Sequence, residues 1–151
     1  QVEAQLEIAE AQDTRAAFEA MGSLKASLFE ATRAVYLQTR DNGHVLRAVH
    51  TYARLHPEAE DDDWQSLVIR SFGPISALFD LYADEITLDD AELGTRMLGV
   101  FFNTIFIRTA LMPQDTLLEA AGIDSDTMIR EVTDMAYGYL TQPRAAAAPV
   151  S

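Results

Sequence analysis

The sequence of 151 residues contains no cysteine, which excludes disulfide bonds, thiolate metal ligands and cysteine nucleophiles. This absence fits the reducing cytoplasm, where we expect the chain to be located. Basic residues are also scarce, with 11 lysine and arginine side chains against 24 acidic ones and a formal net charge of −13. Because nucleic-acid affinity depends on lysine and arginine neutralising phosphates, the chain by itself is not expected to bind DNA.

Long apolar runs are missing as well. The most apolar stretch, Met97–Met112, is shorter than a bilayer span and contains Asn103 and Arg108, so it predicts a buried helix and no membrane partner. Residues 1–20 lack the basic start and the continuous apolar stretch of a signal peptide. At this length roughly 70% of the surface of the unfolded chain can be buried, so we expect a soluble globular domain that needs no metal.

Patterns that carry catalysis are absent too. His44 and His50 are six residues apart, which places them on opposite faces of a helix, where they cannot share a metal ion. There is no His-Glu-x-x-His or Glu-x-x-His pattern and no glycine-rich phosphate loop. Ser23, Ser66 and Ser71 lie outside any Gly-x-Ser-x-Gly elbow. We therefore expect no catalytic residues, no metal site and no cofactor.

What is present is helix-forming sequence, with apolar residues three and four positions apart and no convincing strand or fixed repeat. The fold class that follows is all-α. We expect helices over Val2–Met21, from Leu24 to the Asp41–Gly43 turn, over His44–Leu55, over Asp62–Glu85, up to Met112 and from Asp124 to Leu140. A short segment, Asp115–Ala121, and a disordered tail over residues 142–151 complete the chain.

Particular residues predict where these helices begin and end. Gly22 ends the first helix, and Ser23 is a suitable N-cap for the second. Thr87 or Asp89 is expected to cap the helix that runs to Met112, and Asp124 is expected to cap the last helix.

Two features between residues 57 and 85 have alternative interpretations. Glu58–Asp63 is an acidic run, which indicates either a solvated loop leading into a helix or an ion or partner site. Gly73–Pro74 falls within the expected helix, and a proline there predicts a kink because it removes a backbone hydrogen bond. The kink either shapes the domain passively or frees a carbonyl for a ligand.

Three stretches together resemble the C-terminal part of the tetracycline-repressor (TetR) family. The first is VLRAVHTYARLHPEAEDDDWQSLV, which is similar to the family's sixth helix, its His-Pro-Glu break and the start of its seventh helix. The second is LFDLYADEITLDDAELGTRMLGVFFNTIFIRTAL, which resembles the end of helix seven, a short connector and the long apolar eighth helix. The third, Asp126–Leu140, resembles the closing ninth helix. The likeness covers residues 2 to 140.

The resemblance implies a TetR-like C-terminal domain over residues 1–141, with about six helices. Val2–Met21 would then be the connector helix between the ligand pocket and a DNA-reading domain. The family's helix-turn-helix domain is absent from this sequence, so DNA would be contacted only through that missing part. The expected function is that of an effector-sensing domain, whose ligand releases the full-length repressor dimer from DNA.

The resemblance also implies a pocket among the middle helices for a small, mainly apolar effector. The candidate residues are Phe29, Arg33, Tyr36, His50, Trp64, Val68, Phe72, Phe79, Phe102, Asn103 and Phe106. For any single aromatic residue, an ordinary core position is the better interpretation. Asn103, a polar amide inside an apolar helix, needs a hydrogen-bond partner, which is a ligand, a water or a neighbouring helix.

The last two long helices carry more apolar surface than one small domain readily hides. In the TetR family they pair with their two-fold mates as a four-helix bundle, so the resemblance implies a homodimer. The expected interface residues are Met97, Phe101, Ile105 and Arg108 from one helix and Ile129, Val132, Met135, Ala136 and Tyr139 from the other. The alternative is that this surface packs within the monomer.

Two other functions stay open at this point. A protein-interaction module would dock a partner helix on Met97–Met112, through an open apolar groove and without an enclosed cavity. A helical-bundle enzyme would need two ionisable groups that converge in a cavity and have strongly shifted pKa values. The repressor interpretation instead predicts a closed internal cavity and a dimer formed through the last two long helices.

Overall fold

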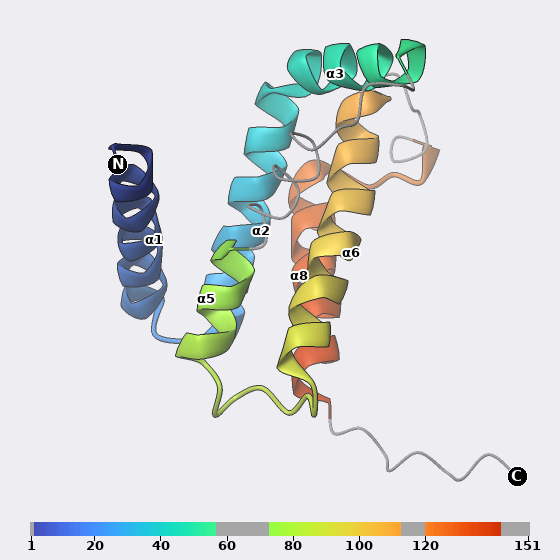
Figure 1. Ribbon diagram of the computed structural model, residues 1–151. Coiled ribbons are helices and arrows are strands. Elements are labelled where there is room, and N and C mark those ends of the chain that lie inside the picture. Colours follow the sequence, from blue (N-terminus) through green and yellow to red (C-terminus); the bar gives the residue numbers. More distant parts are fainter. Residues whose placement is uncertain (1, 57–72, 113–119, 143–151) are drawn as a thin grey trace, which may run out of the picture.

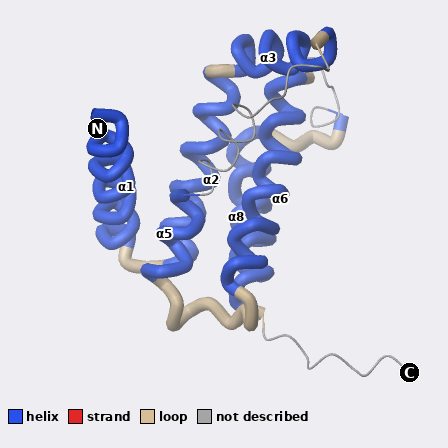
Figure 2. The backbone as a smooth tube through the Cα atoms, in the orientation of Figure 1, coloured by secondary structure: helices blue, strands red, loops and turns tan. Residues whose placement is uncertain are grey.

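The computed structural model describes residues 2–56, 73–112 and 120–142, and these residues form six α-helices and no strand (Figure 1, Figure 2). The helices are α1 (Val2–Met21), α2 (Leu24–Asp41), α3 (Gly43–Leu55), α5 (Gly73–Leu81), α6 (Ala91–Leu111) and α8 (Ser125–Thr141). The all-helical fold class is therefore confirmed for the described ranges. No helix within them combines the length and the apolar character needed to cross a bilayer.

Helix α2 lies at the centre of the arrangement, because each of the other five helices contacts it. Its most extensive contacts are with α8 and α6. Figure 1 shows α6 and α8 each running alongside α2, with α3 across one end and α1 at the outer side of α5. The N-terminal helix is thus attached to the rest mainly through α5.

The central position of α2 follows from its residue pattern. Leu24, Leu28, Thr32 and Tyr36 are four residues apart, so they share one face of the helix, and all four are buried. Leu24 and Leu28 have no exposed surface at all. Complete burial of one leucine side chain stabilises the fold by roughly 1.5–3 kcal/mol. This face, rather than the local helix propensity, holds α2 in place.

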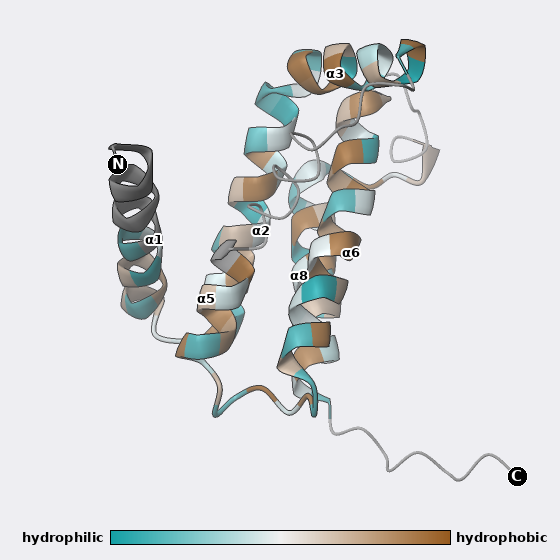
Figure 3. Cartoon of the chain, viewed as in Figure 1, coloured by the Kyte–Doolittle hydropathy of each residue, from teal (hydrophilic) through white to brown (hydrophobic). Residues whose placement is uncertain are grey.

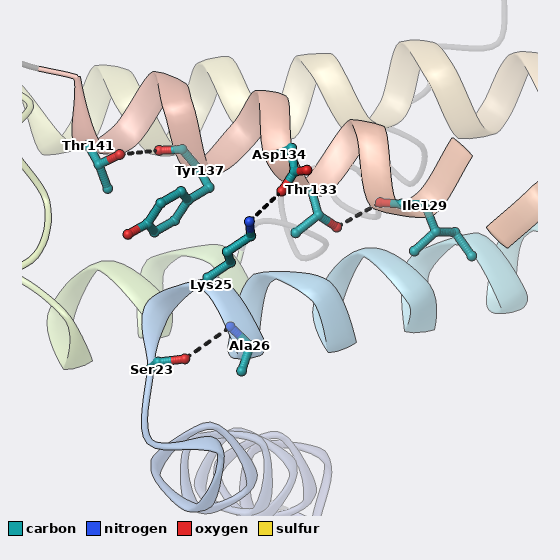
Figure 4. Close-up of polar contacts among 8 residues, drawn as sticks. All are labelled: Ser23, Lys25, Ala26, Ile129, Thr133, Asp134, Tyr137 and Thr141. Carbon is teal, nitrogen blue, oxygen red and sulfur yellow. Dashed lines mark hydrogen bonds and ion pairs between the residues drawn. The ribbon is translucent and has the colours of Figure 1, made fainter. Parts of the chain in front are cut away.

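Helix α8 packs on α2 through a buried stripe and one exposed polar clamp (Figure 4). The stripe consists of Ile129, Val132, Ala136 and Leu140. Beside it, Lys25 Nζ lies 2.8 Å from Asp134 Oδ1 and 5.7 Å from the centre of the Tyr137 ring. The hydrogen bond to Asp134, followed by the Asp134 charge, raises the pKa of Lys25. Because both side chains are more than half exposed, the pair adds little stability, and the buried stripe dominates.

The helix boundaries agree with most of the signals in the sequence. The helix α1 ends at Met21 and Gly22 follows with φ +71°, a left-handed conformation that glycine adopts without strain. Ser23 Oγ accepts the Ala26 backbone N–H at 3.2 Å, and Asp124 Oδ1 accepts that of Thr127 at 2.7 Å. Both predicted N-caps are therefore confirmed.

Two boundaries differ from the prediction. The helix expected to continue to Glu85 ends at Leu81, because Glu85 lies in a turn and its side chain accepts the backbone N–H of Leu24 at 3.4 Å. Neither Thr87 nor Asp89 caps α6; the cap is Asp90, which accepts the Leu93 N–H at 2.8 Å. Both the N–H and the hydroxyl of Thr87 are bonded to the Leu140 carbonyl, which prevents Thr87 from acting as a cap.

Several predictions concern residues outside the described ranges. The acidic run, the first part of the helix expected from Asp62, and most of Asp115–Ala121 and of the tail belong to this group. The kink expected at Gly73–Pro74 concerns the connection between α5 and residues before it that also lie outside the described ranges. These statements stay predictions.

The observed cap of α6 can be tested with two neighbouring aspartates. Replacing Asp90 by alanine leaves the Leu93 N–H without its acceptor, so Asp90→Ala should lower the free energy of unfolding by about 1 kcal/mol. Asp89→Ala removes the same charge one residue earlier and should lower the free energy of unfolding much less. Urea unfolding of both variants measures the difference, and a larger loss for Asp89→Ala would contradict the assigned cap.

The cap of α8 predicts a pH dependence. Hydrogen bonds from the backbone and side chain of Thr127 lower the pKa of Asp124 from its ordinary 3.8. Such a group stabilises the fold above its unfolded pKa, and this contribution is lost as the pH falls through the folded value. Between about pH 5 and about pH 3, the wild type should therefore lose more stability than Asp124→Asn, which keeps an acceptor but does not titrate. The loss is measured by urea unfolding at both pH values. An equal loss of stability in the wild type and in Asp124→Asn would refute this prediction.

Candidate functional site

Three aromatic rings form a continuous group between α2 and α6. The Tyr36 ring meets that of Phe106 edge to face, with 6.0 Å between centroids, and the Phe106 ring stacks on that of Phe102 at 5.9 Å. All three side chains are buried. Such pairs add about 0.5–1.5 kcal/mol beyond the burial of their area, so the group fixes the spacing of the two helices.

A cavity of about 80 Å³ lies at one end of this aromatic group, where α2, α3 and α6 meet. Its lining residues come from all three helices. They are Tyr36, Arg40, Arg47, Phe106, Thr109 and Ala110. The cavity therefore has aromatic and aliphatic walls together with two guanidinium groups.

Arg47 connects α3 to the C-terminal end of α6. Its Nη1 donates a hydrogen bond to the backbone carbonyl of Ala110 at 2.7 Å. The last carbonyls of a helix have no partner within the helix, and they carry the negative end of its dipole, so a guanidinium there is favourable. Gly43 permits this approach, since a Cβ at that position would lie 3.1 Å from Arg47 Nη1 and 3.5 Å from the Ala110 oxygen.

The other polar groups of the cavity already have partners. The Tyr36 hydroxyl lies 2.7 Å from Ser125 Oγ at the start of α8, and the Thr109 hydroxyl donates to the Ile105 carbonyl at 2.9 Å. Arg40 pairs with the adjacent Asp41 at 3.0 Å on the surface. Arg47 differs, because among the described residues no carboxylate pairs with it.

The residues predicted to bind a ligand do not form one group. Tyr36 and Phe106 line the cavity, and Phe102 stacks behind Phe106. Phe79 is buried at the opposite end of α6, where it faces Gly94, and Phe29 is partly buried. Arg33 and His50 are exposed and Asn103 is half-buried, none of them in the cavity lining. The predicted residues outside the described ranges are Trp64, Val68 and Phe72.

The sequence interpretation missed Arg40 and Arg47. Arg40 directly precedes the Asp41–Gly43 turn, and Arg47 follows it by four residues. Their shared location depends on the turn at Asn42, which directs α3 across the end of α6. The basic residues near the turn were visible in the sequence, but the direction of α3 was not.

The residues predicted for a dimer interface divide into two classes. Ile129, Val132 and Ala136 are at most 4% exposed, because they belong to the stripe that faces α2. Met135 is 55% exposed, and Tyr139 is half-buried. Of the predicted interface residues on α8, Met135 and Tyr139 are therefore the two that remain open to a second chain, fewer than the sequence suggests.

Helix α6 also has one covered side and one open side, and Figure 3 shows apolar residues recurring along its length. Leu98, Phe102, Phe106 and Ala110 form its buried stripe. The predicted interface residues Met97, Phe101 and Ile105 each precede a buried residue by one position, which places them about 100° around the helix. Met97 is 48% exposed, whereas Phe101 and Ile105 are half-buried, and Arg108 is exposed at the end of the same side.

We call the open apolar positions of these two helices, taken together, the α6–α8 stripe; they are Met97, Phe101, Ile105, Met135 and Tyr139. On α8, Met135 and Tyr139 precede the buried Ala136 and Leu140 in the same way. Acidic and histidine side chains do not gather in a metal-binding group anywhere in the described ranges. The features that bear on function are therefore the cavity and the α6–α8 stripe.

The role of Arg47 in the fold can be measured directly. Replacing it by methionine keeps the aliphatic length and removes the charged hydrogen bond to Ala110, so the free energy of unfolding should fall by about 1–3 kcal/mol. Arg54→Met removes the same charge from an exposed position on α3 and is the matched control. Denaturant unfolding of the two variants should separate them, and equal stabilities would contradict a structural role for the Arg47 bond.

No protein family, curated protein or solved structure matches this chain in the comparisons made with it. The likeness to the TetR family therefore depends on the sequence pattern alone. What the chain does must be argued from its own cavity and its own surfaces.

Proposed function

We propose that this chain is the effector-sensing and dimerisation domain of a transcriptional repressor of the TetR type. In this proposal two copies pair through the α6–α8 stripe, and the helices around the cavity hold a small ligand. DNA is contacted by a separate domain connected to α1. The chain's net charge of −13 supports the assignment of DNA binding to another part.

The observation that carries the proposal is the exposure of the α6–α8 stripe. Met97 and Met135 are 48% and 55% exposed, although the residue that follows each of them is buried. Apolar side chains aligned along two helices are typical of a surface that a partner covers. A symmetric pair of such chains would bury the same stripe from both copies, which is the isologous arrangement most common in dimers.

The attachment of α1 supports a sensing role. The Tyr82 hydroxyl donates to the Phe18 carbonyl in the last turn of α1 at 2.6 Å, and Ser27 Oγ of α2 lies 3.0 Å from the Tyr82 oxygen. The end of α1 is thus bound to α2 and to the turn after α5. A ligand that binds one arrangement of these helices more tightly than another would shift the position of α1, and with it the attached DNA-reading domain.

The oligomeric state tests the proposal. The wild-type chain should have twice its monomer mass of 16.7 kDa in sedimentation equilibrium. Met135→Glu places a charge in the apolar interface and should raise the dimer dissociation constant roughly a hundredfold or more. Met97→Glu should act in the same way from α6.

Val45→Glu is the matched control, because Val45 on α3 is 48% exposed, as is Met97, but lies outside the α6–α8 stripe. This variant should remain dimeric. A wild-type chain that is monomeric at concentrations of about 100 μM, far above a typical micromolar dissociation constant, would exclude the repressor proposal and favour an interaction module.

A further inference from the structure

We propose that the cavity between α2, α3 and α6 binds the carboxylate of a small organic acid, with Arg47 as the main contact and Arg40 as the second. The apolar part of the ligand lies against Tyr36 and Phe106. The inference rests on the proposed function in one respect only: it takes the bound acid to be the effector and names its chemical class. It adds a charged group to the small, mainly apolar ligand that the sequence suggested.

The charge of Arg47 is the first step of the argument. Its guanidinium carries five N–H donors, of which the Ala110 carbonyl uses one at 2.7 Å. Among the described residues no carboxylate neutralises it, although acidic residues outnumber basic ones by 24 to 11 in the chain. Within the described ranges its remaining donors have no carboxylate partner, which leaves them to an anion from solution.

Arg40 adds a second cation to the same cavity. It pairs with Asp41 at 3.0 Å, and its side chain is 57% exposed. Because exposed pairs between neighbouring residues are weak, Arg40 can exchange Asp41 for a ligand carboxylate at little cost. Within the described part of the chain, the carboxylate paired with a cavity residue is Asp41, and its contact with Arg40 already offsets its charge.

The other polar groups of the lining favour a charged ligand over a neutral one. The Thr109 hydroxyl donates its hydrogen to Ile105, and the hydroxyls of Tyr36 and Ser125 are bonded to each other. The guanidiniums therefore supply the free donors. A carboxylate forms charge-assisted and bidentate bonds with a guanidinium, whereas the amide of the same acid does not.

The size of the cavity limits the ligand. Its volume of about 80 Å³ is roughly half that of an engineered cavity of about 150 Å³ that binds benzene. A carboxylate with a few methylene groups fits, whereas an aromatic ring does not. Phe106 and Ala110, 1% and 5% exposed, form the apolar wall for those methylenes, and the exposed Arg40 lies where the cavity reaches the surface.

The test is a titration of the ¹⁵N-labelled chain with butyrate, with butyramide as the uncharged isostere and inorganic phosphate as a purely anionic competitor. Butyrate should shift the resonances of Arg47 and Ala110 in a saturable manner, and butyramide should bind at least tenfold more weakly. At a concentration of about a hundred times its dissociation constant, butyrate should raise the melting midpoint by roughly 5–10 °C.

The variants separate binding from folding. Arg47→Lys keeps a charge and a donor for Ala110 but loses the bidentate geometry, so the dissociation constant for butyrate should rise about tenfold or more. Arg40→Gln changes an exposed residue and should weaken binding several-fold with an unchanged melting midpoint. Arg54→Gln removes one charge from an exposed position of α3 outside the cavity and should leave the affinity unchanged.

Three results would overturn the inference: no saturable shift with butyrate, equal affinity for butyramide, or equal affinity for phosphate, which would indicate an adventitious ion only. Each of these can occur in a chain that is still dimeric, and the repressor proposal then stands without the carboxylate site. If the chain is monomeric but binds butyrate through Arg47, the carboxylate site stands and the repressor proposal fails.

Discussion

The burial of one face of α2 is the constraint on which the other helices depend. Every other described helix contacts α2, and its Leu24 and Leu28 side chains are completely covered. The polar groups at the start of α2 also contact other segments. Glu85 accepts the Leu24 N–H, and the Ser27 hydroxyl lies against the Phe18 carbonyl and the Tyr82 hydroxyl. A shift of α2 would therefore change the apolar core and the attachment of α1 together, because the same few residues serve both.

The two long C-terminal helices share a design in which the buried and the open apolar sides are offset by one residue. On α6, Met97 precedes Leu98, and on α8, Met135 precedes Ala136. The buried member of each pair packs within the chain, and the exposed member is left for another surface. Because an offset of one residue rotates a side chain by about 100°, both sides can be apolar on the same helix without competing for the same neighbours.

Arg47 joins the cavity to the helix that carries most of the α6–α8 stripe. The same guanidinium stabilises the C-terminal end of α6 through the Ala110 carbonyl and lines the cavity. An anion bound at Arg47 therefore either replaces the hydrogen bond from Arg47 to the Ala110 carbonyl or binds beside it. In the proposed function this contact is a physical route from ligand to interface, since a change at the end of α6 is transmitted along a rigid helix. Tyr36 forms a second connection, from the cavity wall to Ser125 at the start of α8.

The sequence by itself determined the helical fold class, the caps at Ser23 and Asp124 and the end of α1 at Gly22, because these features depend on residues close together in the chain. It also identified Tyr36 and Phe106 as members of a candidate site. Only the tertiary structure decided that Thr87 bonds to Leu140 instead of capping α6, that Ile129, Val132 and Ala136 face α2, and that Arg40 and Arg47 meet at one cavity. The physical reason is that hydrogen bonds and burial between distant segments are stronger than local preferences, and an apolar stripe in a sequence does not reveal which neighbour will cover it.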